Sequence, residues 1–140
     1  MSVLLDTGVL FAFLNAEDDL HARAVRWMQA VGEGRHGAPY VSDFVVAELF
    51  TLIRIRTRNA KLERAARSLL PLPEPALPGL RLLAVGPERL QAVADLYDQH
   101  RDRALSFTDA SLLVLRTAYG LDRIATFDRR LAGLAPTLES

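Results

Sequence analysis

Short apolar runs alternate along the chain with segments in which apolar residues recur every three to four positions. The runs at 3–5, 38–41, 80–85 and 123–127 have the length and composition of buried β-strands. The periodic segments between them predict amphipathic helices, and no internal repeat or low-complexity tract interrupts the alternation. Strands and helices that alternate in this way favour an α/β fold with a parallel sheet covered on both faces.

Cap-type residues and helix-stopping residues set the expected helix limits. Ser42 or Asp43 caps the helix after the second strand, Pro87 suits the first turn of a later helix, and Gly120 ends the helix that follows Ser106 and Thr108. The predicted helices cover residues 9–14, 43–56, 87–100, 109–119 and, briefly, 129–134, and a further helix runs from Asp18 or Asp19 to about Val31. Their expected buried stripes include Leu20, Ala24, Trp27, Met28 and Val31 in the second helix, and Leu90, Val93, Ala94 and Tyr97 in the fourth.

Composition narrows the class of protein. The 140 residues predict one domain, residues 1–140, in which no apolar run approaches the ~18 residues needed to cross a bilayer. The apolar start lacks the basic segment of a signal peptide, and the absence of cysteine excludes disulfides, thiolate nucleophiles and cysteine-based zinc sites. These features favour a cytoplasmic protein without a membrane partner. Lys61 is the only lysine, which leaves almost no room for lysine-dependent chemistry.

Four carboxylates occupy positions that a parallel sheet would bring together. Asp6 and Asp128 each follow a predicted strand, Asp109 lies in the first turn of a helix, and Glu48 is the only charge in the run FVVAELFTLI. Residues that open helices after parallel strands meet at the carboxyl edge of the sheet, so the four side chains are expected to converge there. Other interpretations stay open: Asp6 can be a simple N-cap, and Glu48 can pair with Arg56 or reach solvent at the helix edge.

Convergence of these carboxylates calls for a cation. A pair about 4 Å apart repels by roughly 4 kcal/mol at an effective dielectric near 20. Without a cation, some of the carboxyl groups must protonate through raised pKa values. Oxygen ligands without histidine or cysteine select a hard ion, so the sequence predicts one or two Mg²⁺ or Mn²⁺ ions.

Hydroxyl and arginine side chains flank the four acids. The hydroxyls can hydrogen-bond to carboxylates or to water near the ion, or they can be helix caps and ordinary strand residues. These hydroxyl residues are Thr7, Ser106, Thr108 and Thr126. The arginines can contact a phosphate backbone, although a basic run such as 54–67 is also typical of a solvated helix face. The candidate arginines are Arg54, Arg56, Arg129 and Arg130.

The segments LLDTGVLFAFL, VVAELF, LSFTDASLLVLRTAYGL and IATFD, in this order, resemble the PIN domain and, more narrowly, the VapC-type toxins of bacterial toxin–antitoxin pairs. The resemblance implies a three-layer α/β/α sandwich with a central, mainly parallel sheet. It implies metal-dependent endoribonuclease activity on an RNA substrate, homodimerisation, and inhibition by a cognate VapB-type antitoxin. It assigns metal ligation and catalysis to Asp6, Glu48, Asp109 and Asp128. The proline-rich segment 71–79 matches none of these motifs.

Other enzyme classes fit the residues less well. Asp-Thr-Gly at 6–8 also occurs in aspartic proteases, which need an all-β frame, and phosphatase or receiver readings need a lysine that this chain lacks near the acids. No glycine-rich nucleotide-binding motif is present. The serious alternative is a PIN-like module that binds RNA or protein without turnover. Metal-dependent cleavage abolished by Asp6→Asn or Asp109→Asn distinguishes the two.

Overall fold

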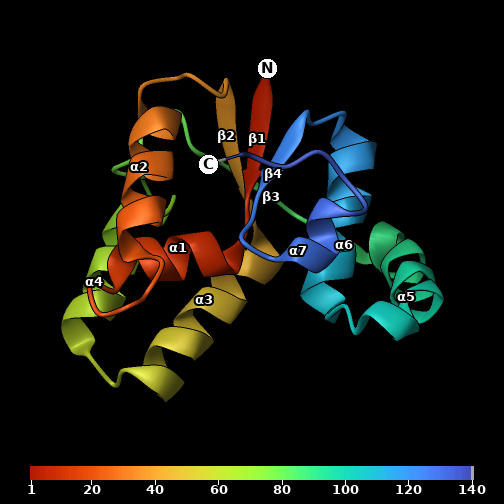
Figure 1. The fold of residues 1–140 in the computed structure, drawn as a ribbon, viewed down its shortest axis with the longest axis horizontal. Coiled ribbons are helices and arrows are strands. Elements are labelled where there is room, and N and C mark those ends of the chain that lie inside the picture. Colours follow the sequence, from red (N-terminus) through yellow and green to blue (C-terminus); the bar gives the residue numbers. More distant parts are fainter. Residues whose placement is uncertain (140) are drawn as a thin grey trace.

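The computed structural model describes residues 1–139 and has a four-stranded parallel sheet at its centre, with strand order β3-β2-β1-β4. The strands are β1 (Ser2–Leu5), β2 (Ala38–Ser42), β3 (Arg81–Leu83) and β4 (Arg123–Ala125). Helices lie on both sides of the strands (Figure 1). The expected α/β/α architecture with a parallel sheet is thereby confirmed. The expected domain 1–140 includes Ser140, which lies outside the described residues.

The described part of the chain contains seven α-helices. In Figure 1, α1 to α4 lie on the left of the strands and α5 to α7 on the right. Their bounds are α1 (Thr7–Leu14), α2 (His21–Gly32), α3 (Asp43–Arg56), α4 (Ala60–Leu69), α5 (Leu90–Gln99), α6 (Phe107–Tyr119) and α7 (Arg129–Ala132). None of the helices in residues 1–139 has the length and apolar character needed to cross a membrane.

The core forms around β1, the strand that pairs with both β2 and β4. Val3, Leu4 and Leu5 are fully buried, because helices cover both faces of the parallel sheet. Successive side chains of β1 point to opposite faces, so a continuous apolar run is needed to fill both. Leu10 of α1 and Leu112 of α6 are also fully buried in the same hydrophobic cluster. Burying each such side chain contributes about 1.5–3 kcal/mol, which fixes the positions of the residues that follow the strands.

Two of the predicted helices differ from the structure. The helix expected from residue 18 begins at His21, because the Asp18 carboxylate accepts a hydrogen bond from the Leu20 N–H in a turn, and Leu20 is exposed. The inner stripe expected for residues 87–100 is also wrong in part, since Leu90 and Tyr97 of α5 are exposed. Helix α5 packs on α6, and a helix packed on one neighbour buries a narrower stripe than one that covers a sheet.

Four helices begin at the same edge of the sheet, and each begins with a polar cap. Asp6 caps α1, Ser42 caps α3, Ser106 caps α6 and Asp128 caps α7 through side-chain hydrogen bonds to backbone N–H groups. The starts of α1 and α3 lie directly at the ends of β1 and β2 in Figure 1. This edge therefore presents several helix N-termini, whose dipoles favour negative charge.

Candidate active site

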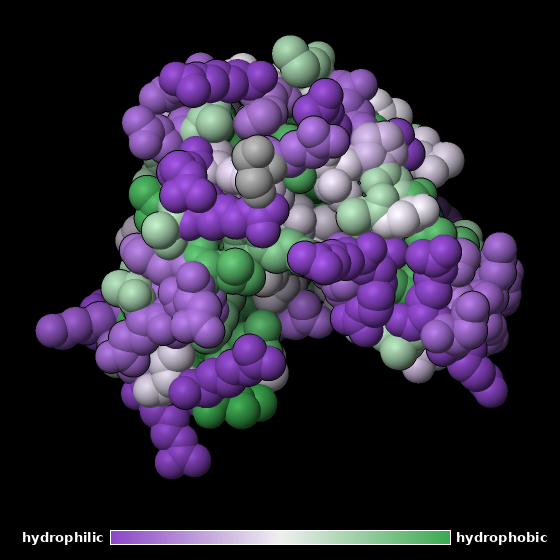
Figure 2. All heavy atoms as spheres, viewed as in Figure 1, coloured by the Kyte–Doolittle hydropathy of each residue, from purple (hydrophilic) through white to green (hydrophobic). Residues whose placement is uncertain are grey.

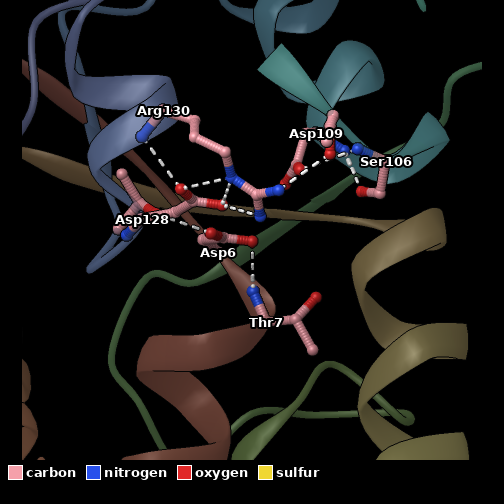
Figure 3. Close-up of polar contacts among 8 residues, drawn as sticks. Asp6, Thr7, Ser106, Asp109, Asp128 and Arg130 are labelled. Carbon is pink, nitrogen blue, oxygen red and sulfur yellow. Dashed lines mark hydrogen bonds and ion pairs between the residues drawn. The ribbon is translucent and has the colours of Figure 1, made fainter. Parts of the chain in front are cut away.

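Asp6 lies at the centre of the acidic residues, directly after β1 (Figure 3). One carboxylate oxygen accepts a hydrogen bond from the Thr7 N–H at 2.7 Å, and the other accepts one from the Thr126 hydroxyl at 2.7 Å. The side chain is nearly inaccessible to solvent. Burial raises the pKa of Asp6 to about 6, the charges of Asp109 and Glu48 add to the rise, and the two hydrogen bonds oppose it.

Asp109 is held by the first turn of α6. Its backbone N–H donates to the Ser106 hydroxyl at 3.0 Å, and its carboxylate accepts from the Ser106 N–H at 2.9 Å, which completes a capping box. Burial raises the pKa of this buried carboxyl group. The negative charge of Asp128 adds to that rise, whereas the bonds to Ser106 and the charge of Arg130 lower the pKa.

Asp128 is engaged by an arginine of its own helix. The Arg130 Nε donates to the two carboxylate oxygens at 3.0 and 3.2 Å, and one terminal nitrogen donates at 2.7 Å. These hydrogen bonds lower the pKa of Asp128. The other terminal nitrogen donates to the carbonyl of Ala104 at 2.8 Å, in the loop before α6. Figure 3 shows the guanidinium between the Asp128 carboxylate and Asp109, so Arg130 links α7 to the start of α6 across the site.

Glu48 approaches the same group from α3. It is half-buried in the second turn, and its charge is near enough to raise the pKa of Asp6. The ion pair with Arg56 considered from the sequence is wrong: the Arg56 guanidinium lies 5.9 Å from the centre of the Phe11 ring, and none of the ion pairs in residues 1–139 includes Glu48.

The four predicted carboxylates thus meet at one edge, but not as a formed metal site. Across the described residues, no three acidic or histidine side chains adopt an arrangement that would hold a metal ion. The reason is visible in the contacts above: Asp109 faces its own helix cap, and the Arg130 guanidinium binds Asp128. In this geometry Arg130 supplies positive charge beside two of the acids.

The donor set nonetheless fits a hard divalent ion. All four acids present oxygen ligands, and burial leaves the ionised form of Asp6 without enough compensating charge. Beside Asp6, the Thr7 hydroxyl is buried and has no hydrogen-bond partner among residues 1–139. An unpartnered buried hydroxyl is costly, and water held by an ion would give it a partner.

Of the remaining predicted hydroxyl residues, one contacts the acids and one does not. Thr126 bridges two acids, because its hydroxyl donates to Asp6 and accepts from the Asp128 N–H at 3.0 Å. Thr108 is half-buried beside Asp109, and no hydrogen bond in the described chain joins its hydroxyl to a carboxylate. The roles of these hydroxyl groups stay predictions.

The predicted arginines do not form one surface. Arg54 pairs with Glu63 at 2.9 Å between α3 and α4, and Arg129 is exposed at the start of α7. Arg130 alone contacts the acids. Arg130 is predicted from the sequence to contact a phosphate backbone, whereas the structure pairs it with Asp128, an ion pair that was not predicted. Its position two residues after a capping aspartate was the available signal.

Comparison with known proteins gives one family. The PIN domain family model matches residues 3–135. The search of curated proteins finds no match.

Solved structures share the fold at low sequence identity. VapC20 from Mycobacterium tuberculosis, described as a sarcin–ricin loop cleaving toxin, superposes with a TM-score of 0.79 at 21% identity, covering 94% of each chain. FitAcB from Neisseria gonorrhoeae gives a TM-score of 0.63 at 23% identity, covering 98% of this chain and 96% of that one. VapBC2 from Rickettsia felis, bound to a promoter DNA fragment, gives 0.66 at 12% identity and covers 99% and 98%.

Proposed function

The chain belongs to the PIN domain family, and from that premise we propose that it is a metal-dependent endoribonuclease whose active site is the acidic edge around Asp6. The observation that carries the proposal is the convergence of like charges on a buried carboxyl group. Asp6 lies beside the charges of Asp109 and Glu48 at a depth that raises its pKa to about 6. Burial and repulsion between the carboxylates make this arrangement unfavourable in the absence of a cation. A cation bound by several of these carboxylates at once best explains why the fold brings them together.

Asp6 and Asp109 are the proposed direct ligands, because each is buried and fixed by hydrogen bonds from its own helix start. Glu48 and Asp128 would ligate directly or hold water molecules. Mg²⁺ or Mn²⁺, as one or two ions, would orient and acidify a water molecule and offset negative charge on the phosphodiester. Thr126 keeps the Asp6 carboxylate in one orientation, and Ser106 does the same for Asp109. Arg130 would leave Asp128 and become free to contact the RNA backbone.

The wider biological role follows from the family resemblance. We propose a toxin of a toxin–antitoxin pair that forms a homodimer and is inhibited by a VapB-type antitoxin. The similarity of fold to VapC20, which is described as a toxin, supports the proposal that this protein is a toxin. The similarity of fold to VapBC2 and FitAcB is consistent with that proposal. The competing proposal is a PIN-like module that binds without turnover. The ion pair between Arg130 and Asp128 favours that alternative, because it withdraws one of the four acids.

The test is RNA cleavage with and without the ion. Total RNA is incubated with the protein in Mn²⁺ or Mg²⁺, and again with chelator, and the cleaved ends are mapped. Cleavage that needs the ion and is lost in Asp6→Asn and Asp109→Asn supports the nuclease. Asp98→Asn is the matched control, because Asp98 is an exposed aspartate of α5 and is not one of the four acids. RNA binding without cleavage in either ion refutes the nuclease and favours the binding module.

A further inference from the structure

Two aromatic rings and an arginine join α2 to the segment that leads into α7. The rings of Trp27 in α2 and Phe127, the residue before Asp128, have centres 4.7 Å apart. The guanidinium carbon of Arg23, one turn before Trp27, lies 5.0 Å from the centre of the Trp27 ring and 4.9 Å from that of Phe127. At these distances an arginine is attracted to an aromatic face. Two side chains of one helix therefore hold the Phe127 ring.

This cluster connects the two sides of the molecule. Helix α2 lies on the left of the strands in Figure 1, and α7 lies on the right. Figure 2 shows that the surface is hollowed at its lower edge, between these two sides. Phe127 belongs to the segment between β4 and α7 but packs on α2, so it ties the start of α7 to the helices on the other side.

Residues 126–128 contact the acidic site and α2 in alternation. The Thr126 hydroxyl donates to Asp6 and accepts from the Asp128 N–H, and Asp128 caps α7. Phe127, between them, contacts α2 instead. The backbone at Asp128 is extended, and neighbouring side chains of an extended backbone point to opposite sides. Holding the Phe127 ring therefore also sets the direction in which Asp128 presents its carboxylate.

The rings are the contacts that hold the Arg23 side chain in the described part of the chain. Its Nε is buried and has no hydrogen-bond partner among residues 1–139, and none of the ion pairs there includes Arg23. The Nε1 of Trp27 is likewise buried and has no partner in that range. The attraction within this cluster is therefore that of a cation and two aromatic faces.

We propose that Phe127 is a positioning residue which, held by Trp27 and Arg23, keeps the Asp128 carboxylate directed toward the other acids. The inference rests on the proposed metal-dependent function, and it adds that α2, which supplies none of the four acids, sets the metal affinity of the site. Residues that orient a ligand without touching the ion change affinity by about 10–100-fold when they are mutated. The competing explanation is a purely structural one, because Trp27 also belongs to the hydrophobic core.

The first measurement is amide hydrogen exchange in the metal-free protein, followed by NMR. The Asp128 N–H donates to the Thr126 hydroxyl at 3.0 Å, so its exchange rate reports how firmly the segment is held. Phe127→Leu keeps the apolar bulk and removes the ring. It is expected to speed exchange of the Asp128 N–H about fivefold and to leave the N–H groups of β1 unchanged. A loss of global stability alone would speed exchange at both places.

The second measurement is Mn²⁺ affinity by calorimetry, together with RNA cleavage. Phe127→Leu is expected to bind Mn²⁺ about tenfold more weakly and to lower kcat at a fixed Mn²⁺ concentration, with little change in KM for RNA. Arg23→Gln leaves the core side chains in place and is expected to weaken Mn²⁺ binding about threefold. Phe127→Tyr keeps an aromatic face and is expected to bind Mn²⁺ as the wild type does.

The matched control is Tyr119→Leu. The ring of Tyr119 also has an arginine against it, since the guanidinium carbon of Arg89 lies 4.9 Å from its centre. Tyr119 is the last residue of α6, whereas Asp109 lies in the first turn of that helix. Its replacement is expected to leave both the Mn²⁺ affinity and the exchange of the Asp128 N–H unchanged.

The outcomes separate this inference from the proposed function. If the wild type binds Mn²⁺ and both Phe127→Leu and Arg23→Gln bind it equally well, the positioning inference is overturned. Exchange of the Asp128 N–H that is no faster than in the wild type, or that rises only in step with β1, also overturns it. If the wild type takes up no Mn²⁺, the proposed nuclease function fails, and the exchange rates alone decide whether Phe127 positions Asp128.

Discussion

The variant Asp6→Asn is expected to stabilise the metal-free protein while abolishing metal uptake. Asp6 has its pKa raised from 3.8 to about 6 in the fold, and this difference corresponds to about 3 kcal/mol between the protonated and ionised forms. The folded state therefore holds a proton that the unfolded state has lost between these two pH values. The contribution of Asp6 to the free energy of unfolding is highest below about pH 3.8, falls as pH rises, and levels off above about pH 6.

Asparagine cannot ionise, so the variant lacks this loss of stability. Its amide oxygen can still accept from the Thr7 N–H, but its amide nitrogen would face the Thr126 hydroxyl, which now donates to Asp6. Turning that hydroxyl costs about 1 kcal/mol, roughly one hydrogen bond. The net expectation is about 2 kcal/mol of added stability at pH 7.5 and no gain near pH 3.5.

Urea unfolding in chelator at pH 3.5, 5, 6 and 7.5 measures the difference. The control is Asp98→Asn, which is expected to follow the wild type at every pH because Asp98 is exposed. Adding millimolar Mn²⁺ is expected to stabilise the wild type and leave Asp6→Asn unchanged, since only a folded site that binds the ion is stabilised by it. Parallel pH curves for wild type and Asp6→Asn would show that burial does not raise the Asp6 pKa, and would refute the reasoning.

Three further outcomes follow from contacts in the structure. Arg130→Gln is expected to bind Mn²⁺ several-fold more tightly than the wild type in calorimetry, because the ion no longer competes with the guanidinium for the acids. The control is Arg129→Gln, since Arg129 is an exposed neighbour. Equal Mn²⁺ affinities of Arg130→Gln and the wild type would contradict the competition. Ser106→Ala removes the side-chain cap of α6 and is expected to lower the free energy of unfolding by about 1 kcal/mol in urea. Gly37→Ala places a Cβ in collision with the Met1 carbonyl oxygen, at a φ of +79°. It is expected to lower stability by at least about 2 kcal/mol, and a smaller change by thermal unfolding would mean that the chain end moves freely.

Strand β1 was predictable because it is buried on both faces of the sheet. An apolar run such as Val3–Leu5 followed at once by a capping aspartate indicates a strand and then a helix without reference to the rest of the chain. The inner face of α5 was not predictable in the same way. Its apolar residues have helical spacing, but which of them are buried depends on α5 packing against α6 and not on the sheet. That contact lies between elements and leaves no local signal.

Part of the candidate site was also predictable from the sequence, and part was not. Convergence of the four acids follows from topology, because three of them open helices at the carboxyl edge of a parallel sheet. The position of Arg130 does not follow from topology, because its guanidinium binds both Asp128 and the carbonyl of Ala104, which lies 26 residues earlier in the chain. The contacts of Phe107 with Phe44 and Tyr97 do not follow from the sequence either, because those two residues come from two other helices.

The acids themselves show why a capping role and a functional role are not alternatives here. Asp6 and Asp128 are N-caps and Asp109 completes a capping box, so each stabilises a helix start and each lies where helix dipoles offset part of its charge. These three positions would be intelligible in a protein without any activity. Glu48 is different: it lies in the second turn of α3, half-buried, with no side-chain hydrogen bond or ion pair within residues 1–139, and its charge raises the pKa of Asp6. None of these contacts gives Glu48 a role in capping or pairing, so Glu48 is the residue that most strongly separates a cation-binding site from a set of helix caps.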